Sequence, residues 1–157
     1  FADAIKRLGR KAVEAKYGNL FDDGGEPMTS IPDELIDLLE RPLFADLATI
    51  REDGTPQVNP MWYAWDGQFL KFTHTNFRKK FKNIKANPAV AISIIDQDNP
   101  YRYVEIRGVV DHIDPDPTGA FYVELAKRYN APFGTDAPKD AADRVIIYVR
   151  PTFAGGH

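Results

Sequence analysis

Three consecutive cationic side chains, Arg78-Lys79-Lys80, stand where the sequence changes from a strand pattern to a helix pattern. The predicted helix places Phe77, Phe81 and Ile84 on its buried face, at spacings i, i+4 and i+7. The three cations then lie in the first turn, on or beside the exposed side. The helix macrodipole favours anions at this end, and the first-turn N–H groups have no intrahelical acceptors. Because a phosphate group would satisfy both the cations and these N–H groups, the segment predicts an anion site of phosphate type.

Two other interpretations of this basic segment remain open. It could be the solvated face of an ordinary surface helix, or a patch for nucleic acid or nuclear import. The whole chain has a net charge of −3 and a pI near 5.6. Nucleic-acid binders usually carry a basic footprint over the whole domain, so a local cluster suits a small anionic ligand better. We therefore expect no nucleic-acid partner.

Length and composition indicate one globular domain with a sizeable core, because the 157 residues are 43% apolar and 27% charged. The chain has no cysteine, which excludes disulfides, thiol nucleophiles and thiolate metal sites. Its three histidines stand far apart in the sequence, and we expect no metal site. No apolar run reaches the roughly 18 residues that a membrane-spanning helix needs, and no signal-peptide pattern is present. These features predict a soluble, cytoplasmic protein.

Two regions are expected along the chain. Residues 1–27 predict a basic amphipathic helix, over about residues 1–16, followed by a linker rich in glycine and aspartate. Such a helix can contact an anionic membrane or a partner, but it more often packs on its own domain. Residues 28–157 form the second region, a compact domain that opens with a helix for which Ser30 is the candidate cap.

Short strand patterns separated by turn signals fill most of residues 28–157. Strands are predicted at 44–51, 57–65, 68–75, 89–96, 101–112 and 144–150. Turns such as Asp66-Gly67 favour antiparallel hairpins, and a third helix with Phe121, Leu125 and Tyr129 on one face follows Pro117. The pattern predicts a mainly β protein with helices (α+β), built on an antiparallel six-stranded barrel.

An unusual strand precedes the basic helix. Pro60 stands inside the pattern Gln57-Val58-Asn59-Pro60-Met61-Trp62, which indicates an edge strand, a bulge or a backbone that faces something else. With Tyr63 and Trp65, Trp62 could form a flat aromatic wall for a planar ligand; alternatively these rings belong to the core or to a dimer interface. His74 ends the next strand, where it could face a ligand or serve as a hydrogen-bonded structural residue.

These segments, in this order, resemble the pyridoxamine 5′-phosphate oxidase-like split β-barrel superfamily, which includes FMN-binding proteins. The similarity runs from about Leu35 to Pro151, and it is most specific to the deazaflavin (coenzyme F420) branch. It is carried by Leu47 to Trp62, by Arg78-x-Lys80-x-x-Asn83-Ile84 with Asn87-Pro88, and by Tyr103 to Gly108. The resemblance implies a homodimer with two cofactor sites at the subunit interface.

The same resemblance implies which residues bind the cofactor. Residues that hold its phosphate would be Arg78, Lys79 and Lys80, with Asn83 supporting the turn. Residues along the deazaflavin or flavin ring would be Gln57, Val58, Asn59, Pro60 and Met61. Residues at the ribityl chain or phosphate would be Thr73, His74 and Thr75. Residues that reach in from the other subunit would be Tyr101, Arg102 and Tyr103.

The function implied by the resemblance is that of a reductase that transfers a hydride between F420 and a small planar organic substrate. Alternatives are an FMN-dependent oxidase or reductase of the same fold, and a non-catalytic carrier of flavin, deazaflavin or haem. The Arg-x-Lys-x-x-Asn spacing and the short C-terminal strand favour F420 over FMN. The C-terminal Arg-x-His pattern of pyridoxamine phosphate oxidases is missing here. No catalytic residue is assigned, since Tyr101, Tyr103, His74 or solvent could supply a proton.

Overall fold

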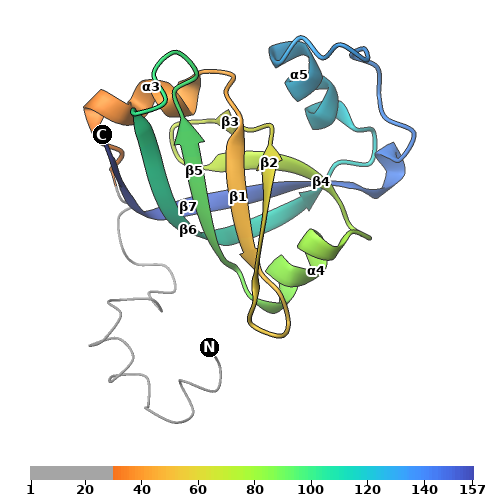
Figure 1. Cartoon of the computed structure of the whole chain (residues 1–157). Coiled ribbons are helices and arrows are strands. Elements are labelled where there is room, and N and C mark those ends of the chain that lie inside the picture. The colour runs from red at the N-terminus through yellow and green to blue at the C-terminus, as the bar shows by residue number, and fades with distance from the viewer. Residues whose placement is uncertain (1–29) are drawn as a thin grey trace.

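The computed structural model describes residues 30–157 (Figure 1). The predicted basic helix and linker of residues 1–27 lie outside these described residues. Within the described part of the chain, no helix is long and apolar enough to cross a membrane.

Strands are the main regular structure of the described chain, and short helices lie between them. The strands are β1 (Ala45–Ile50), β2 (Pro56–Met61), β3 (Ala64–Trp65), β4 (Leu70–Thr75), β5 (Ala89–Ile95), β6 (Tyr103–Pro115) and β7 (Arg144–Gly156). The helices are η1 (Asp33–Leu35), α3 (Ile36–Glu40), α4 (Lys79–Ala86), α5 (Ala120–Arg128) and η2 (Ala141–Asp143). The residue before η1 is Pro32, and no side chain caps that helix, so the predicted capping by Ser30 was wrong.

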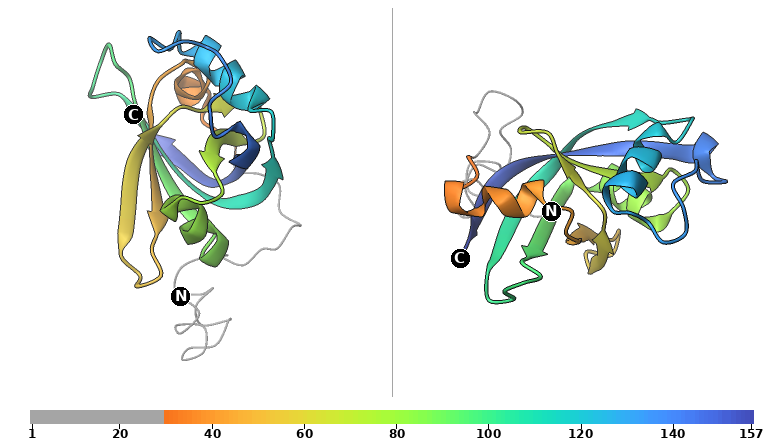
Figure 2. Two further views of the ribbon diagram at one scale, coloured as in Figure 1. Left: turned by 90° about the vertical axis from the view of Figure 1, so that its right-hand side faces the viewer. Right: turned by 90° about the horizontal axis from the view of Figure 1, so that it is seen from above.

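All strand pairs are antiparallel and form one sheet in the order β2-β1-β5-β6-β7-β4-β3. The sheet curves strongly into a half-barrel, with α3 at one end and α4 at the other (Figures 1 and 2). The class was predicted correctly as antiparallel and mainly β. The predicted number of strands was wrong, because the sheet has seven strands where six were expected.

The additional strand arises where the predicted strand 57–65 divides. After β2, Trp62 and Tyr63 leave the strand pairing, and the Tyr63 N–H donates to the Tyr129 hydroxyl at 3.1 Å. The chain then crosses to the opposite edge of the sheet as β3. The acceptor comes from the end of α5, far along the sequence, so no local pattern marks this break.

The concave face of the sheet holds the core. Alternate residues point inward, such as Leu47 in β1, Ile92 in β5, Ile106 in β6 and Ile147 in β7, each at most 2% exposed. The last strand also continues beyond the predicted limit at Arg150, as far as Gly156. The register between β6 and β7 shifts at two places, and Gly108 stands at one of them. A Cβ on this glycine would lie 2.8 Å from the Arg150 carbonyl oxygen, so the two strands approach too closely for a side chain.

Candidate functional site

The basic helix begins later than predicted, and this changes which side chains it buries. Arg78 is the N-cap residue in an extended conformation (φ −82°, ψ 159°), and the helix starts at Lys79. Phe77 precedes the helix and is 54% exposed, so its predicted place on the buried face was wrong. The prediction was correct for Ile84, which is buried, and for Phe81, which packs against the core. Lys80 and Asn83 are also buried, at spacings i and i+3, which was not predicted.

Lys80 is the main electrostatic anomaly of the site, because only 5% of its surface is exposed. The prediction that it lies at the exposed side of the helix was therefore wrong. Its Nζ donates to the Met61 Sδ at 3.2 Å, and no ion-pair partner stands beside it within residues 30–157. Burial, and after it the charge of Arg78, lowers the pKa of Lys80. A buried ammonium without a counter-ion is costly, so the site favours an anion from outside the chain.

The end of β4 adds buried polar groups that have no partner. The Thr73 Oγ1, His74 Nε2 and Thr75 Oγ1 are all buried without a hydrogen bond among the described residues. Neighbouring residues of a strand point to opposite faces, so Thr73 and Thr75 share one face and His74 lies on the core side with Phe72. Of the three residues predicted to contact the ribityl chain or phosphate, Thr73 and Thr75 therefore lie on one face of β4 and His74 on the other.

His74 is uncharged at neutral pH. Burial lowers the pKa of its imidazole to about 4, and the positive charges of Lys80, Arg78 and Arg144 lower it further. The prediction of a hydrogen-bonded structural histidine is not met at Nε2, which lacks a partner within residues 30–157. As a neutral ring, His74 can accept or donate a hydrogen bond but carries no surplus proton at neutral pH.

Asn83 connects three elements around Lys80. Its Nδ2 donates to the Thr49 Oγ1 at 3.2 Å and to the Gln57 Oε1 at 3.1 Å, which links α4 to β1 and β2. The Gln57 Nε2 in turn donates to the Asn59 Oδ1 at 3.2 Å. This network supports the predicted role of Asn83 in positioning the start of α4. Thr49 also belongs to this network. The only sign of this role in the sequence was the position of Thr49 on the inward face of a predicted strand.

The predicted ring-binding residues lie on an edge strand, β2, which explains how Pro60 is tolerated there. Gln57, Asn59 and Met61 pair with inward-pointing residues of β1 and therefore face the concave side. Val58 and Pro60 belong to the opposite, exposed set, and Val58 is 60% exposed. The alternation therefore divides this set of predicted residues between the two faces of the strand.

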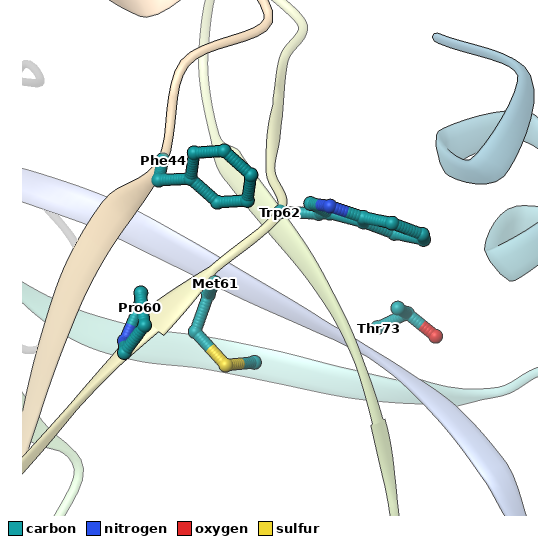
Figure 3. Close-up of a pocket in the computed structure, with 5 residues that line it drawn as sticks. All are labelled: Phe44, Pro60, Met61, Trp62 and Thr73. Atoms are coloured by element: carbon teal, nitrogen blue, oxygen red, sulfur yellow. The ribbon is translucent and has the colours of Figure 1, made fainter. Parts of the chain in front are cut away.

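A pocket of about 230 Å³ opens at the end of β2. Its lining residues are Phe44, Pro60, Met61, Trp62 and Thr73 (Figure 3). Two of the predicted contact segments, one in β2 and one in β4, therefore meet in one cavity. Met61 also contacts Lys80, so the pocket adjoins the buried ammonium group.

The predicted aromatic wall is only partly correct. Trp62 lines the pocket, and Figure 3 shows its indole extending from the end of β2. Tyr63 is fully buried, with its hydroxyl donating to the Leu38 carbonyl oxygen at 2.5 Å, and Trp65 packs against the core. The second aromatic residue of the pocket is instead Phe44, which the sequence analysis did not single out.

The third predicted segment, residues 101–103, lies at the end of the sheet near α3, opposite α4 (Figure 1). Arg102 is engaged there within its own chain, in ion pairs with Asp37 at 2.5 Å and Asp96 at 3.3 Å. These pairs raise the pKa of Arg102. Hydrogen bonds from Arg41, from the Asp98 backbone N–H and from Arg102 lower the pKa of Asp96 to about 2. Tyr101 is 83% exposed. Within one chain, this segment does not reach the pocket.

A phosphate-bearing cofactor fits the residues present. Among the described residues, Lys80 is a buried cation without a counter-ion, and Thr73 and Thr75 offer unpartnered hydroxyl groups on one face of the adjacent strand. An anion accepting bonds from these groups would remove the desolvation cost that each now bears. Arg78 and Lys79 are exposed at the same helix start and can approach the same anion. The adjoining pocket is lined by uncharged side chains, as a ring system requires.

Comparisons with known proteins give a consistent result. The family model for pyridoxamine 5′-phosphate oxidase matches residues 31–154. A solved structure named F420 Reductase is 63% identical, has a TM-score of 0.77, and aligns over 80% of this chain and 98% of its own. A conserved hypothetical protein of Mycobacterium tuberculosis is 25% identical, with a TM-score of 0.63 and 81% and 84% of the two chains covered.

The fold extends to more distant proteins. General Stress Protein 26 of Bacillus anthracis is 20% identical, with a TM-score of 0.59 over 78% of this chain and 89% of its own. No curated protein sequence matches the chain. The curved antiparallel sheet, the Arg-x-Lys-x-x-Asn helix start and the family match agree, and the chain therefore belongs to the pyridoxamine 5′-phosphate oxidase family of split β-barrels.

Proposed function

We propose that the protein is a coenzyme F420-dependent oxidoreductase. The observation that carries this proposal is the buried ammonium of Lys80, which has no counter-ion within residues 30–157 and adjoins an uncharged pocket through Met61. The similarity to a protein named F420 Reductase, at 63% identity, favours the deazaflavin over FMN. The substrate would be a small planar organic molecule.

Lys80, Arg78 and Lys79 would hold the cofactor phosphate, with the Thr73 and Thr75 hydroxyl groups as further donors. Asn83 would keep Lys80 in position through its bonds to Thr49 and Gln57. Pro60 and Met61 would contact the ring through the pocket that they line. When bound, the deazaflavin supplies hydride transfer, and the protein supplies binding, orientation and exclusion of water.

A homodimer completes this proposal. The strand registers place Val58, Ala48, Ala91, Arg107 and Phe153 in one row across the convex face of β2, β1, β5, β6 and β7. Val58 and Phe153 are 60% and 41% exposed. The small side chains of Ala48 and Ala91 leave the surface beside Val58 flat enough for a second sheet, and Arg107 lies between Ala91 and Phe153. The predicted contribution of Tyr101 and Tyr103 to a neighbouring site depends on this dimer, whereas Arg102 already has partners in its own chain.

The oligomeric state can be measured by light scattering after gel filtration. We expect a dimer for the natural sequence and a folded monomer for Ala91→Lys, since this exposed position would place a second positive charge beside Arg107 in the middle of the row. A monomeric natural protein would contradict the proposed interface.

The cofactor can be identified by titrating the protein with F420 and, separately, with FMN, following cofactor fluorescence at two salt concentrations. We expect tighter binding of F420, and a salt dependence that reflects the phosphate site. Reduced F420 should then be oxidised in the presence of planar acceptors. Preference for FMN would move the protein to the flavin branch, and binding of neither would refute the proposal. Tight F420 binding without turnover of any acceptor would indicate a carrier protein.

A further inference from the structure

Trp62 is the central ring of an aromatic cluster beside the pocket. Its indole is nearly parallel to the ring of Tyr129, with centroids 5.3 Å apart and an interplanar angle of 14°. It is also nearly parallel to the ring of Phe133, at 5.8 Å and 12°. Tyr122 contacts the same indole at 5.9 Å with a tilt of 44°. Three rings from separate parts of the chain therefore share almost one orientation.

Buried hydrogen bonds fix the orientation of Trp62. The Tyr129 hydroxyl donates to the Leu43 carbonyl oxygen at 2.5 Å and accepts the N–H of Tyr63 at 3.1 Å. Tyr63 is the residue directly after Trp62, and its side chain is fully buried. The indole is thus held by its stacking partner and by its neighbour in the chain, and it presents a preorganised surface.

Phe133 is presented by an ordered helix end. The Ala131 N–H donates to the Ala126 carbonyl at 2.9 Å and the Asn130 N–H to the Lys127 carbonyl at 3.2 Å, which together form a Schellman motif. Asn130 adopts the left-handed conformation this motif requires, with φ 47°. The chain therefore leaves α5 along a defined path, and Phe133 follows two residues after the buried Ala131.

The rings at the mouth of the pocket are unusually exposed. Phe133 is 70% exposed and Phe44 is 49% exposed, while Trp62 is half-buried between the pocket and the cluster. An apolar ring covering them would be favoured in proportion to the apolar area removed from water. None of the residues lining the pocket is charged, and the nearby Lys80 ammonium is assigned to the cofactor phosphate, so a charged group on the substrate would lose its hydration without a partner.

From this arrangement we infer that Trp62 and Phe133 form the binding surface for the substrate, and that the substrate carries an uncharged, planar aromatic ring. Phe44 closes the pocket side of this surface. The volume of about 230 Å³ is smaller than the roughly 300–1,000 Å³ of pockets that enclose a drug-sized ligand. Because the proposed function places the cofactor ring in this pocket, the substrate ring lies on the exposed aromatic surface at the mouth of the pocket. The inference rests on the proposed function, because it assigns the substrate of that same site.

The test compares two ligands of the same skeleton, 2-acetonaphthone, which is planar and aromatic, and 2-acetyldecalin, which is saturated and puckered. Binding is measured by calorimetry with the protein saturated with oxidised F420, which has no hydride to transfer. We expect 2-acetonaphthone to bind about 2- to 12-fold more tightly than its saturated counterpart, since only the aromatic ligand can stack. Equal affinities would overturn the aromatic requirement.

Variants then locate the surface. Phe133→Leu keeps an apolar side chain without the ring, and Phe133→Ala removes both; the exposure of Phe133 allows each to fold. We expect 2-acetonaphthone to bind about 2- to 10-fold more weakly to Phe133→Leu, with a larger loss for Phe133→Ala. The matched control is Phe69→Leu, because the Phe69 ring contacts His112 and Tyr148 and does not line the pocket. Unchanged affinity in both Phe133 variants would overturn the inference.

The F420 titration separates this inference from the proposed function. Phe133 lies outside the proposed phosphate site, so its variants should bind F420 as tightly as the natural protein does. If F420 binds but 2-acetonaphthone does not, the aromatic surface is not the substrate site and the cofactor assignment stands. If F420 fails to bind, the proposed function fails, and binding of 2-acetonaphthone to the cofactor-free protein still decides whether the surface recognises a planar ring.

Discussion

Replacing Lys80 by Met should have opposite effects on stability and on cofactor affinity. The natural side chain is a buried ammonium whose only polar contact within residues 30–157 is the Met61 Sδ. Methionine keeps an unbranched side chain of similar length but removes the charge. The cofactor-free variant should therefore be more stable than the natural protein, because it no longer buries an uncompensated charge.

The effect on binding follows from the phosphate contact. A hydrogen bond to a charged group contributes about 1.5–3 kcal/mol, so loss of the Lys80 contact should weaken F420 binding by about 10- to 150-fold. The effect on stability depends on pH. The pKa of Lys80 in the folded protein lies below the 10.5 of an ordinary lysine. The destabilisation is therefore complete below the pKa of Lys80 in the folded protein, and it disappears as the pH rises from there to 10.5. The stability advantage of Lys80→Met should shrink over that range.

Two measurements test this reasoning: F420 titration by fluorescence quenching, and thermal unfolding with and without F420. The matched control is Lys82→Met, which removes the same charge from an exposed position of the same helix. We expect the control to change F420 affinity and stability only slightly. An unchanged F420 affinity in Lys80→Met would refute the phosphate assignment. A less stable cofactor-free variant would show that the ammonium is compensated in the natural protein.

Three further changes test other parts of the structure. The pKa of His74 is lowered to about 4 in the folded protein, from an ordinary 6.5. Protonation of His74 should therefore leave the free energy of unfolding unchanged above pH 6.5 and lower it by about 3 kcal/mol as the pH falls to about 4. In urea unfolding, His74→Gln should not show this pH-dependent loss. Tyr129→Phe leaves the buried Tyr63 N–H without its acceptor and should lower the free energy of unfolding by about 1–3 kcal/mol in urea titrations. Equal stability would mean that this hydrogen bond does not cause the break between β2 and β3. Gly108→Ala places a Cβ 2.8 Å from the Arg150 carbonyl oxygen and should cost about 1–3 kcal/mol in thermal unfolding; no loss would mean that the two strands can separate there.

Much of the fold could be predicted because the controlling interactions are local. Alternating apolar residues and turn signals located β1, β4, β5 and the start of β6 to within a few residues. The same local signals misplaced the end of β7, which continues because β6 offers backbone partners as far as Gly156. They also missed the break between β2 and β3, since the deciding acceptor is the hydroxyl of Tyr129.

The candidate site was predicted less completely than the fold. Residue type indicated an anion site at Arg78-Lys79-Lys80, and Pro60 correctly indicated an edge strand. Sequence periodicity, however, assigned Phe77 to the core and Lys80 to the surface, and both assignments were wrong. Phe77 was misplaced because the helix begins only at Lys79. Lys80 was misplaced because the packing of α4 on β1 and β2, made through Asn83, decides which side of the helix is buried.

The sequence by itself therefore determined the antiparallel mainly β class, the family resemblance and the location of a cationic helix start, because hydrophobic period, turn residues and charge are properties of neighbouring residues. Only the tertiary structure decided that Lys80 is buried against Met61, that Thr73 shares a pocket with Phe44, and that rings from β2 and the end of α5 stack together. Burial and pairing depend on residues far apart in the chain. They are fixed only when the curved sheet brings its two edges and its covering helices into contact.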